Sequence, residues 1–337
     1  MSQMMFEQTM TLPTHHCQDM FAYILASLLI WFLCWWIRDR RKLEHLSDKY
    51  VFITGCDTGF GNLAAKSFDK TGFWVLAGCL TEEGAQRLSN ETSSRLKTIV
   101  LDITKSESIE NAVNQIKQEV GHRGLWGLVN NAGIVGTLCP IDWLRTEHFR
   151  RPIEVNLLGS IEVTLKLLPL IKKARGRIVN ISSVLGRLAV SGGGYYVSKF
   201  GIEGFNDSLR RDMKRFGIKV ACIEPGTFET RMTNCEIHRH EKECLWDDLP
   251  PDVRKEYGED DLIQSVVRRE KLVKLLSSTD LSLVVWCMEH ALSAKYPRTR
   301  YSAGIDAKLL WIPLSYLPTF IADYLLTTDT IINPSSV

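Results

Sequence analysis

The hydrophobic pattern of the chain is an alternation of short apolar runs with longer amphipathic stretches. The apolar runs are rich in Val, Ile and Leu, which is typical of parallel strands buried on both faces. They cover residues 50–55, 73–79, 96–101, 125–130, 177–182 and 219–224. The helical stretches lie between them, at residues 61–70, 106–120, 146–174 and 195–216. Strands that alternate with helices in this way predict right-handed βαβ crossovers and a parallel sheet.

We therefore predict an α/β fold, in which residues 49–305 form a single domain on a doubly wound (Rossmann) parallel sheet of six to seven strands. Within it, residues 227–278 are dense in charge and weak in strand signals. This segment is predicted to form a helical lid over the open edge of the sheet, where a substrate would bind. The C-terminal segment, residues 306–337, is apolar again. Pro313 and Pro318 disfavour a straight membrane-spanning helix there, so an in-plane membrane contact or a packed element is expected.

Residues 20–37 (MFAYILASLLIWFLCWWI) contain no charged side chain and are just long enough to cross the hydrocarbon core of a bilayer as a helix. A cleaved signal peptide would have basic residues before the apolar run, whereas here Lys and Arg follow it. We predict an uncleaved membrane anchor at 20–37, an N-terminal extension at 1–19 and a linker at 38–48. The basic flank after the anchor places the domain that follows on the cytosolic side. A signal peptide and a buried core helix are the alternatives.

Composition narrows the class of protein further. Of the 337 residues, 45% are apolar and 24% are charged, which is ordinary for a packed globular protein. A formal net charge of +2 gives no basic surface for nucleic acid, so no nucleic-acid partner is expected. The nine cysteines are odd in number and none forms a CxxC motif. Neither a disulfide framework nor a metal site is therefore expected, and free thiols fit a reducing compartment.

The first predicted strand runs into residues 54–61 (TGCDTGFG). Gly55, Gly59 and Gly61 allow a tight turn and a close approach of the backbone to a pyrophosphate at a helix N-terminus. Because the loop follows a strand and opens a helix, it predicts a dinucleotide site. Residues 75–81, at the end of the second strand, include no acidic partner for a ribose 2′-hydroxyl and no basic partner for a 2′-phosphate. No Lys or Arg precedes Gly59 in the loop either, so NAD is expected, with NADP as the alternative.

Tyr195 and Lys199 are four residues apart, so on a helix they share one face. A cation beside the Tyr195 phenol would lower its pKa from about 10 toward the working pH. Tyr195 is therefore expected to take the proton of an alcohol as hydride leaves, or to return it in the reverse direction. Ser183 is expected to hydrogen-bond the substrate oxygen, with the neighbouring Ser182 as the alternative. Tyr196 does not have the spacing to share that face with Lys199.

These motifs, together with Asn130–Gly133 (NNAG) and a Pro-Gly pair after the sixth strand, resemble the short-chain dehydrogenase/reductase superfamily over residues 49–305. Within that superfamily the sequence is similar to the branch of microsomal retinol and hydroxysteroid dehydrogenases. The stretches that carry this second resemblance are 50–62 (YVFITGCDTGFGN), 192–200 (GGGYYVSKF), 203–213 (EGFNDSLRRDM) and 311–315 (WIPLS). Residues 1–19 lie outside the resemblance.

The resemblance implies a role for each residue that matches a family motif. Asn156 would hold a water in a proton relay with Lys199, which completes a catalytic set of Ser183, Tyr195, Lys199 and Asn156. Asp102 would contact adenine, and Pro225, Gly226 and Thr230 would clamp the nicotinamide. The implied cofactor-binding set is Gly55, Asp57, Thr58, Gly59, Phe60, Gly61, Asp102, Asn131, Ala132, Gly133, Tyr195, Lys199, Pro225, Gly226 and Thr230. The substrate would contact Ser183 and Tyr195.

The resemblance and the anchor together predict NAD-dependent oxidation of a lipophilic alcohol at the endoplasmic reticulum membrane. The substrate would be retinol, oxidised to retinal, or a 3α-hydroxysteroid, oxidised to a ketosteroid, and the sequence leaves both open. An NADPH-dependent carbonyl reductase and a non-catalytic lipid-binding protein are the alternatives, and the intact catalytic set argues against the second. Relatives commonly form homodimers through the helices that correspond to 146–174 and 195–216, so a homodimer also stays open.

Overall fold

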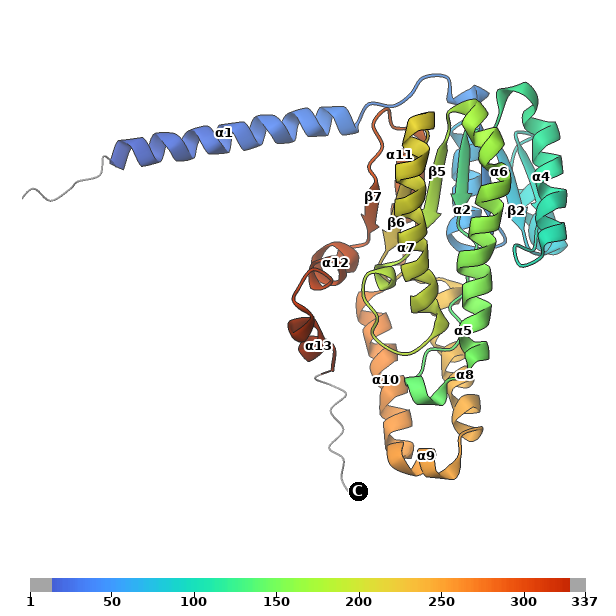
Figure 1. Cartoon of the computed structure of the whole chain (residues 1–337), viewed down its shortest axis with the longest axis vertical. Coiled ribbons are helices and arrows are strands. Elements are labelled where there is room, and N and C mark those ends of the chain that lie inside the picture. The colour runs from blue at the N-terminus through green and yellow to red at the C-terminus, as the bar shows by residue number, and fades with distance from the viewer. Residues whose placement is uncertain (1–13, 328–337) are drawn as a thin grey trace, which may run out of the picture. The chain divides into compact units, whose positions relative to one another are not determined.

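The computed structural model describes residues 14–327, with the side chains of residues 20–327 other than residue 261. Seven parallel strands form one sheet in the order β3-β2-β1-β4-β5-β6-β7, and the predicted α/β doubly wound fold is confirmed (Figure 1). The strands are β1 (Tyr50–Thr54), β2 (Trp74–Cys79), β3 (Leu96–Val100), β4 (Gly127–Asn130), β5 (Arg177–Ile181), β6 (Lys219–Pro225) and β7 (Arg300–Ala303). Only β7 had no counterpart among the apolar runs, because it is short and polar at two of its four positions.

Helices cover both faces of the sheet, because successive strand residues point to opposite faces. On β1, Val51 and Ile53 belong to one apolar core, and Phe52 belongs to the other. The first core is closed by α2 (Gly59–Lys70), α3 (Glu82–Asn90) and α11 (Ser282–Ser293). The second is closed by α4 (Ser106–Val120), α6 (Ser160–Ala174) and α7 (Gly194–Met213). All strands run the same way, so the loops that follow them meet at one edge of the sheet.

The helix predicted over residues 146–174 is interrupted. Helix α5 (Thr146–Ile153) passes through a π-helical segment, Glu154–Gly159, before it continues as α6. Single π-helical turns inside α-helices occur often at functional sites. The interruption contains Asn156, one of the expected catalytic residues.

The segment predicted as a lid is helical, with α8 (Cys235–Asp247), α9 (Pro251–Tyr257) and α10 (Glu259–Leu276). Figure 1 shows these helices in orange, at the lower end of the sheet. The segment leaves and returns at one parallel bridge, between Phe228 and Ser278. It packs on the loop before α5 through a small apolar core that includes Trp143 and Trp246, whose ring centroids are 5.1 Å apart.

The C-terminal segment folds into short helical pieces near its two prolines. A π-helical turn, Ala307–Trp311, is followed by α12 (Ile312–Leu314) and α13 (Thr319–Thr327). None of these pieces is long enough to span a bilayer. Trp311 and Leu314 are buried, whereas Leu309 and Phe320 are 77% and 73% exposed. Residues 328–337 of the predicted segment lie outside the described residues.

Helix α1 (Thr14–Asp39) belongs to a separate compact unit, which also contains residues 294–296. Within this unit Lys42 forms an antiparallel bridge with Ala294, and the Arg38 guanidinium lies 4.6 Å from the centroid of the Tyr296 ring. Residues Met20–Asp39 are long and apolar enough to cross a membrane, and in the described part of the chain no other helix is. The structure is thus consistent with the predicted anchor at 20–37.

Candidate active site

The loop after β1 has a conformation that depends on its glycines. Gly55 and Gly59 have φ angles of +72° and +64°. A Cβ on Gly55 would lie 2.7 Å from the Ala132 Cα, and a Cβ on Gly61 would lie 2.3 Å from the Gly55 carbonyl oxygen. A Cβ on Gly59 would meet nothing within 4 Å, so Gly59 faces open space at the N-terminus of α2. This arrangement fits a pyrophosphate, because the positive end of a helix dipole faces that space.

Thr58 and Asn131 complete the loop. Thr58 precedes α2 in an extended conformation, and its side chain does not cap the helix, which leaves N-terminal N–H groups for another acceptor. The Asn131 side-chain amide donates to the carbonyl oxygens of Thr54 and Gly55, at 2.9 and 3.0 Å. Asn131 therefore holds the loop against the end of β4, and its amide group is directed at the protein rather than at open space.

Asp57 connects the same loop to the end of β2. Its carboxylate accepts hydrogen bonds from the backbone N–H groups of Leu80 and Thr81, at 2.8 and 3.0 Å, and from the Thr81 hydroxyl at 2.9 Å. The end of β2 is where the adenosine ribose lies in dinucleotide-binding folds of this kind. The structure therefore places a negative charge at the ribose end of the site, a position that the sequence pattern did not reveal.

Asp102 lies at the end of β3, in the position expected for an adenine contact. Its Oδ1 accepts from the backbone N–H and the hydroxyl of Thr104, at 3.0 and 2.7 Å, and its Oδ2 lies 3.3 Å from the Lys105 ammonium. Burial raises the pKa of the Asp102 carboxyl, but the bonds from Thr104 and the Lys105 cation outweigh burial, so the pKa is lowered. Asp102 is therefore a fixed, ionised carboxylate.

Asn156 connects the loop after β4 with the helix α7. It is buried, its Oδ1 accepts from the Ile134 N–H at 2.8 Å, and its amide donates to the Ile134 carbonyl and to the Ser198 hydroxyl, both at 2.9 Å. A Cβ on Gly133 would lie 3.2 Å from Oδ1 and 3.8 Å from the Lys199 ammonium. Both amide donors of Asn156 are engaged by the protein, and Asn156, Gly133 and Lys199 lie together.

Lys199 and Tyr195 share one face of α7, as their spacing predicts. Lys199 is buried, and its ammonium donates to the Ile181 carbonyl at 2.8 Å and lies 5.6 Å from the centroid of the Tyr195 ring. Burial lowers the pKa of Lys199 to about 8, against the nearby Cys222 and Glu203, which raise it. The ammonium is therefore close to losing its proton near neutral pH.

The pKa of Tyr195 differs from the expectation. Burial raises the pKa of the phenol above its ordinary value, and the hydrogen bond with the Ser183 side chain lowers it by less. The expectation that Lys199 lowers the pKa of Tyr195 was wrong for the chain by itself. The ammonium is directed at the Ile181 carbonyl, and burial of the phenol has the larger effect on its pKa. A protonated phenol next to a serine hydroxyl is nevertheless an arrangement suited to proton transfer.

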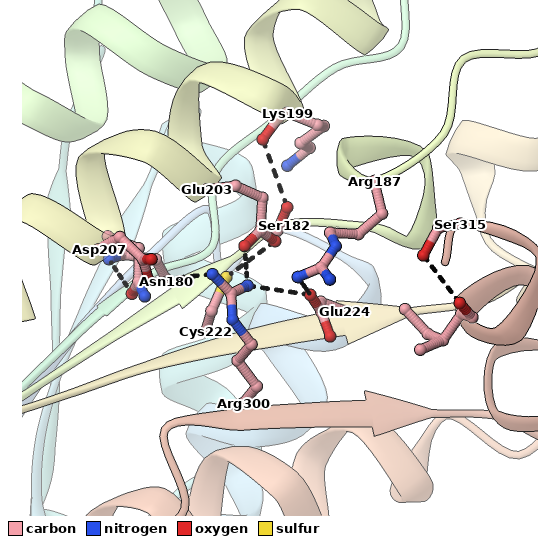
Figure 2. A network of polar contacts seen from close by, with 12 residues as sticks. Asn180, Ser182, Arg187, Lys199, Glu203, Asp207, Cys222, Glu224, Arg300 and Ser315 are labelled. Atoms are coloured by element: carbon pink, nitrogen blue, oxygen red, sulfur yellow. Dashed lines mark hydrogen bonds and ion pairs between the residues drawn. The ribbon is translucent and has the colours of Figure 1, made fainter. Parts of the chain in front are cut away.

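The two serines after β5 have different surroundings. The Ser183 hydroxyl is hydrogen-bonded to Tyr195 and accepts from the Leu185 N–H at 3.1 Å. The Ser182 hydroxyl faces the Lys199 backbone carbonyl, 3.5 Å away, and a Cβ on Gly186 would lie 2.6 Å from it. Ser182 is thus packed inside the protein (Figure 2), whereas Ser183 adjoins the phenol, which favours Ser183 for the substrate contact.

Tyr196 differs from Tyr195 in its surroundings, because the Ser183 side chain is hydrogen-bonded to Tyr195 and not to Tyr196. Its side chain is buried, its ring is T-shaped to that of Tyr195 at 6.3 Å, and burial raises the pKa of its phenol. Tyr196 therefore offers an internal control for the chemistry of Tyr195.

Pro225 ends β6, and the loop that follows contains the expected nicotinamide clamp. The Gly226 N–H donates to the Ala303 carbonyl at 2.8 Å, which continues the β6–β7 pairing by one residue. Thr230 caps a short 3-10 helix together with Thr233, whose hydroxyl accepts from the Thr230 N–H at 3.0 Å. Phe60 reaches this loop from the glycine loop: its ring is T-shaped to that of Phe228, with centroids 5.5 Å apart.

A network of charged residues behind α7 was not predicted (Figure 2). Glu203 and Asp207 follow Lys199 by one and two helical turns, and Arg300 of β7 pairs with both and with Glu224 of β6. The Arg300 guanidinium lies 3.0 Å from the Asp207 and Glu224 carboxylates. Arg187, in the loop after β5, lies 3.4 Å from the same Glu224 oxygen. The helical spacing of Glu203 and Asp207 was a usable signal, but nothing in the sequence indicated their partner on β7.

The short chain dehydrogenase family model matches residues 49–241. The chain is 52% identical to the Bos taurus protein named dehydrogenase/reductase SDR family member 9, over 94% of this chain and 100% of that protein. It is 54% identical to retinol dehydrogenase 7 of Rattus norvegicus, over 90% of this chain and 96% of that protein. It is 51% identical to 17-beta-hydroxysteroid dehydrogenase type 6 of Homo sapiens, over 91% of this chain and 97% of that protein.

Solved structures show the same fold. A short-chain dehydrogenase from Streptomyces avermitilis superposes with a TM-score of 0.65 at 23% identity, over 84% of this chain and 97% of that one. The 3-ketoacyl-(acyl-carrier-protein) reductase from Brucella melitensis, complexed with NADH, has a TM-score of 0.52 at 27% identity, over 56% of this chain and 79% of that one.

The chain therefore belongs to the short-chain dehydrogenase family, and it is an oxidoreductase. Its likeness to both retinol and hydroxysteroid dehydrogenases confirms the branch that the motifs indicated. Membership of the family implies an NAD or NADP cofactor, and the glycine loop described above fits one.

Proposed function

We propose that the protein is a membrane-anchored, NAD-dependent dehydrogenase that oxidises a lipophilic alcohol, either a retinol to retinal or a 3α-hydroxysteroid to a ketosteroid. The observation that carries the proposal is the placement of Ser183, Tyr195 and Lys199 at one edge of the sheet, next to a glycine loop that faces open space. The named relatives act on both substrate classes, so both belong to the proposal.

The chain's own residues would handle the proton. Ser183 and Tyr195 would hold the alcohol oxygen between their hydroxyls, and Tyr195 would accept the alcohol proton as the carbon loses hydride. The bound dinucleotide would supply the hydride acceptor. The Lys199 ammonium would stabilise the phenolate form of Tyr195 that accepts this proton, and its low pKa would allow it to release a proton onward near neutral pH. Both amide donors of Asn156 are engaged by Ile134 and Ser198, so a relay water would not accept its hydrogen bond from this amide group.

Asp57 supports NAD over NADP. Its carboxylate is fixed at the end of β2 by three hydrogen bonds from Leu80 and Thr81. A 2′-phosphate in that position would meet a negative charge, whereas a 2′-hydroxyl would meet an acceptor.

Initial rates measured with the full chain in microsomes test the proposal. We expect oxidation of all-trans-retinol or of androstanediol with NAD, and rates at least tenfold lower with NADP, in line with roughly one like-charge contact. Equal or better rates with NADP would contradict the cofactor, and no oxidation of either alcohol would contradict the substrate class. A Tyr195→Phe chain made in parallel corrects for other microsomal dehydrogenases.

We further propose that α1 anchors the protein in the endoplasmic reticulum membrane, with the catalytic domain in the cytosol. The apolar residues of α1 are exposed, and the basic residues of the linker follow it, as the positive-inside rule requires. In sealed microsomes, protease added without detergent should digest the domain after Arg38. Protection of that domain, or a glycan on the exposed Asn90, would place it in the lumen instead.

A further inference from the structure

Asp306 lies between the ends of β6 and β7, next to the expected nicotinamide clamp. Its side chain is buried, and its Oδ2 accepts a hydrogen bond from the Thr227 N–H at 2.7 Å. A Cβ on Gly226 would lie 2.1 Å from Oδ1, and a Cβ on Gly304 would lie 2.6 Å from it. The carboxylate thus occupies space that any larger residue at either position would need.

Among the residues whose side chains the structure describes, no cation forms an ion pair with this carboxylate. Burying a charge without a cation is costly, so a neutral residue would serve stability at least as well here. The free-energy cost of burying this carboxylate has an explanation if the carboxylate holds a neighbouring loop in position. Its acceptor is directed at the backbone of the loop that follows Pro225, which is the part of the site that would meet the nicotinamide.

The loop held by Asp306 is connected to the lid and to the glycine loop. The Thr227 backbone carbonyl accepts from the Ser278 N–H at 3.0 Å, and the Glu229 N–H donates to the Ser278 carbonyl at 3.0 Å, so the base of the lid is fixed at the same place. The next residue, Phe228, packs its ring over Gly304 and against Phe60 of the glycine loop. A loop ordered before binding loses less conformational entropy when a ligand arrives.

We propose that Asp306 is a positioning residue that holds the Pro225–Thr227 backbone ready for the nicotinamide end of the cofactor. The inference rests on the proposed function in that the ligand is a nicotinamide dinucleotide. Loss of the carboxylate then weakens the binding of the nicotinamide half and leaves the adenosine half unaffected.

Calorimetric titration of the detergent-solubilised full chain with NADH and with ADP-ribose separates these halves, because ADP-ribose lacks only the nicotinamide. For Asp306→Ala we expect roughly tenfold weaker NADH binding, the effect of one lost hydrogen bond to a charged group, and unchanged ADP-ribose binding. Asp306→Asn keeps an acceptor for the Thr227 N–H and should bind NADH within about threefold of the wild type. An equal loss for both ligands, or no loss for NADH, would overturn the inference.

Gly226→Ala tests the contact between Asp306 and the Thr227 N–H independently, because the added methyl group displaces the Asp306 carboxylate. We expect the same selective loss for NADH, and unchanged NADH binding would overturn the inference even if Asp306→Ala fails to fold. In the Asp306→Ala background the methyl group has room and should add no further loss, whereas two losses that multiply would contradict a shared contact. A wild-type chain that binds neither NADH nor ADP-ribose would instead refute the proposed function.

Discussion

The two halves of the candidate cofactor site are built in different ways. In the half formed by β1, β2 and β3, the two carboxylates Asp57 and Asp102 are held by neighbours in their own or the adjoining loop, as Asp102 is by Thr104 and Lys105. In the half formed by β4 to β7, buried side chains are held by elements far away in the sequence. Arg300 pairs with Glu203 across 97 positions, and Asp306 bonds Thr227 across 79.

The difference shows which interactions hold the side chains of each half in position. On the proposed function, the adenosine half would bind the invariant part of the cofactor, and a turn with the correct glycines would suffice for that task. The nicotinamide half would have to hold Ser183 and Tyr195 within hydrogen-bond reach of the alcohol oxygen, with the Lys199 ammonium beside the phenol. It does so with buried, charged groups that cost stability and that lock each other in place. The predictions below test that contrast.

The largest effect is expected in the nicotinamide half, for Tyr195→Phe. Without the phenol hydroxyl no group accepts the alcohol proton, so kcat should fall roughly a thousandfold. Tyr196→Phe is the matched control, since it removes a buried hydroxyl that is not hydrogen-bonded to Ser183, and kcat should stay near the wild-type value. Steady-state kinetics with one alcohol and NAD decides the matter, and a Tyr195→Phe enzyme with full activity would refute the mechanism.

The second effect concerns stability. Arg300→Met leaves Glu203 and Glu224 without their shared cation, so the free energy of unfolding should fall by about 3 kcal/mol. Lys97→Met, in the other half, breaks the exposed Lys97–Glu119 pair and should cost less than about 1 kcal/mol. Denaturant unfolding of both variants measures the contrast directly. Equal losses would show that the two halves do not differ in how they are held.

The third effect tests the ribose end. Asp57→Asn removes the charge fixed at the end of β2, so the ratio of kcat/KM with NADP to that with NAD should rise about tenfold. Asp102→Asn, in the same half, should weaken both cofactors alike and leave the ratio unchanged. If the ratio does not respond to Asp57, the preference for NAD arises elsewhere.

The smallest effect concerns the cost of burying Lys199. Its pKa is lowered to about 8, against about 10.4 in an unfolded chain, so between these values the unfolded state binds more protons. Wild-type stability should therefore rise with pH from about 8 to about 10.4. Lys199→Met, although inactive, should melt roughly 2–4 °C higher at pH 7 and lose this advantage near pH 10. A variant less stable than wild type at pH 7 would show that the bond to Ile181 outweighs the burial cost.

The sequence predicted the adenosine half well, because its residues act within single turns. Gly55, Gly59 and Gly61 could be assigned from their order alone, and the strands before them from their apolar runs. Asp57 was assigned to the cofactor, but its bonds to Leu80 and Thr81 depend on how β1 and β2 pair. Pairing between strands is a property of the folded chain that a single sequence does not display.

In the nicotinamide half, helical spacing placed Tyr195 and Lys199 correctly on one face of a helix, but the sequence pattern did not predict how deeply the two side chains are buried. Proximity of a cation predicted a lowered phenol pKa, whereas burial, which only packing reveals, raises it. The partners of Arg300 and Asp306 could not be predicted for the same reason, since only the folded sheet brings these residues close to the groups that they contact. Spacing could not separate Ser182 from Ser183 either, because both follow the same strand and only their surroundings differ.

The bridge between Phe228 and Ser278 has a consequence for how such enzymes diverge. About fifty residues lie between the two ends of this bridge and contain none of the seven strands, so their replacement need not alter the strand order. A graft of residues 230–277 from a relative would also have to carry the Trp143 loop, because that loop packs against Trp246 and Tyr257. On the proposed function, an exchange of both pieces together would alter which alcohol the enzyme accepts, whereas Ser183, Tyr195 and Lys199 would be inherited unchanged.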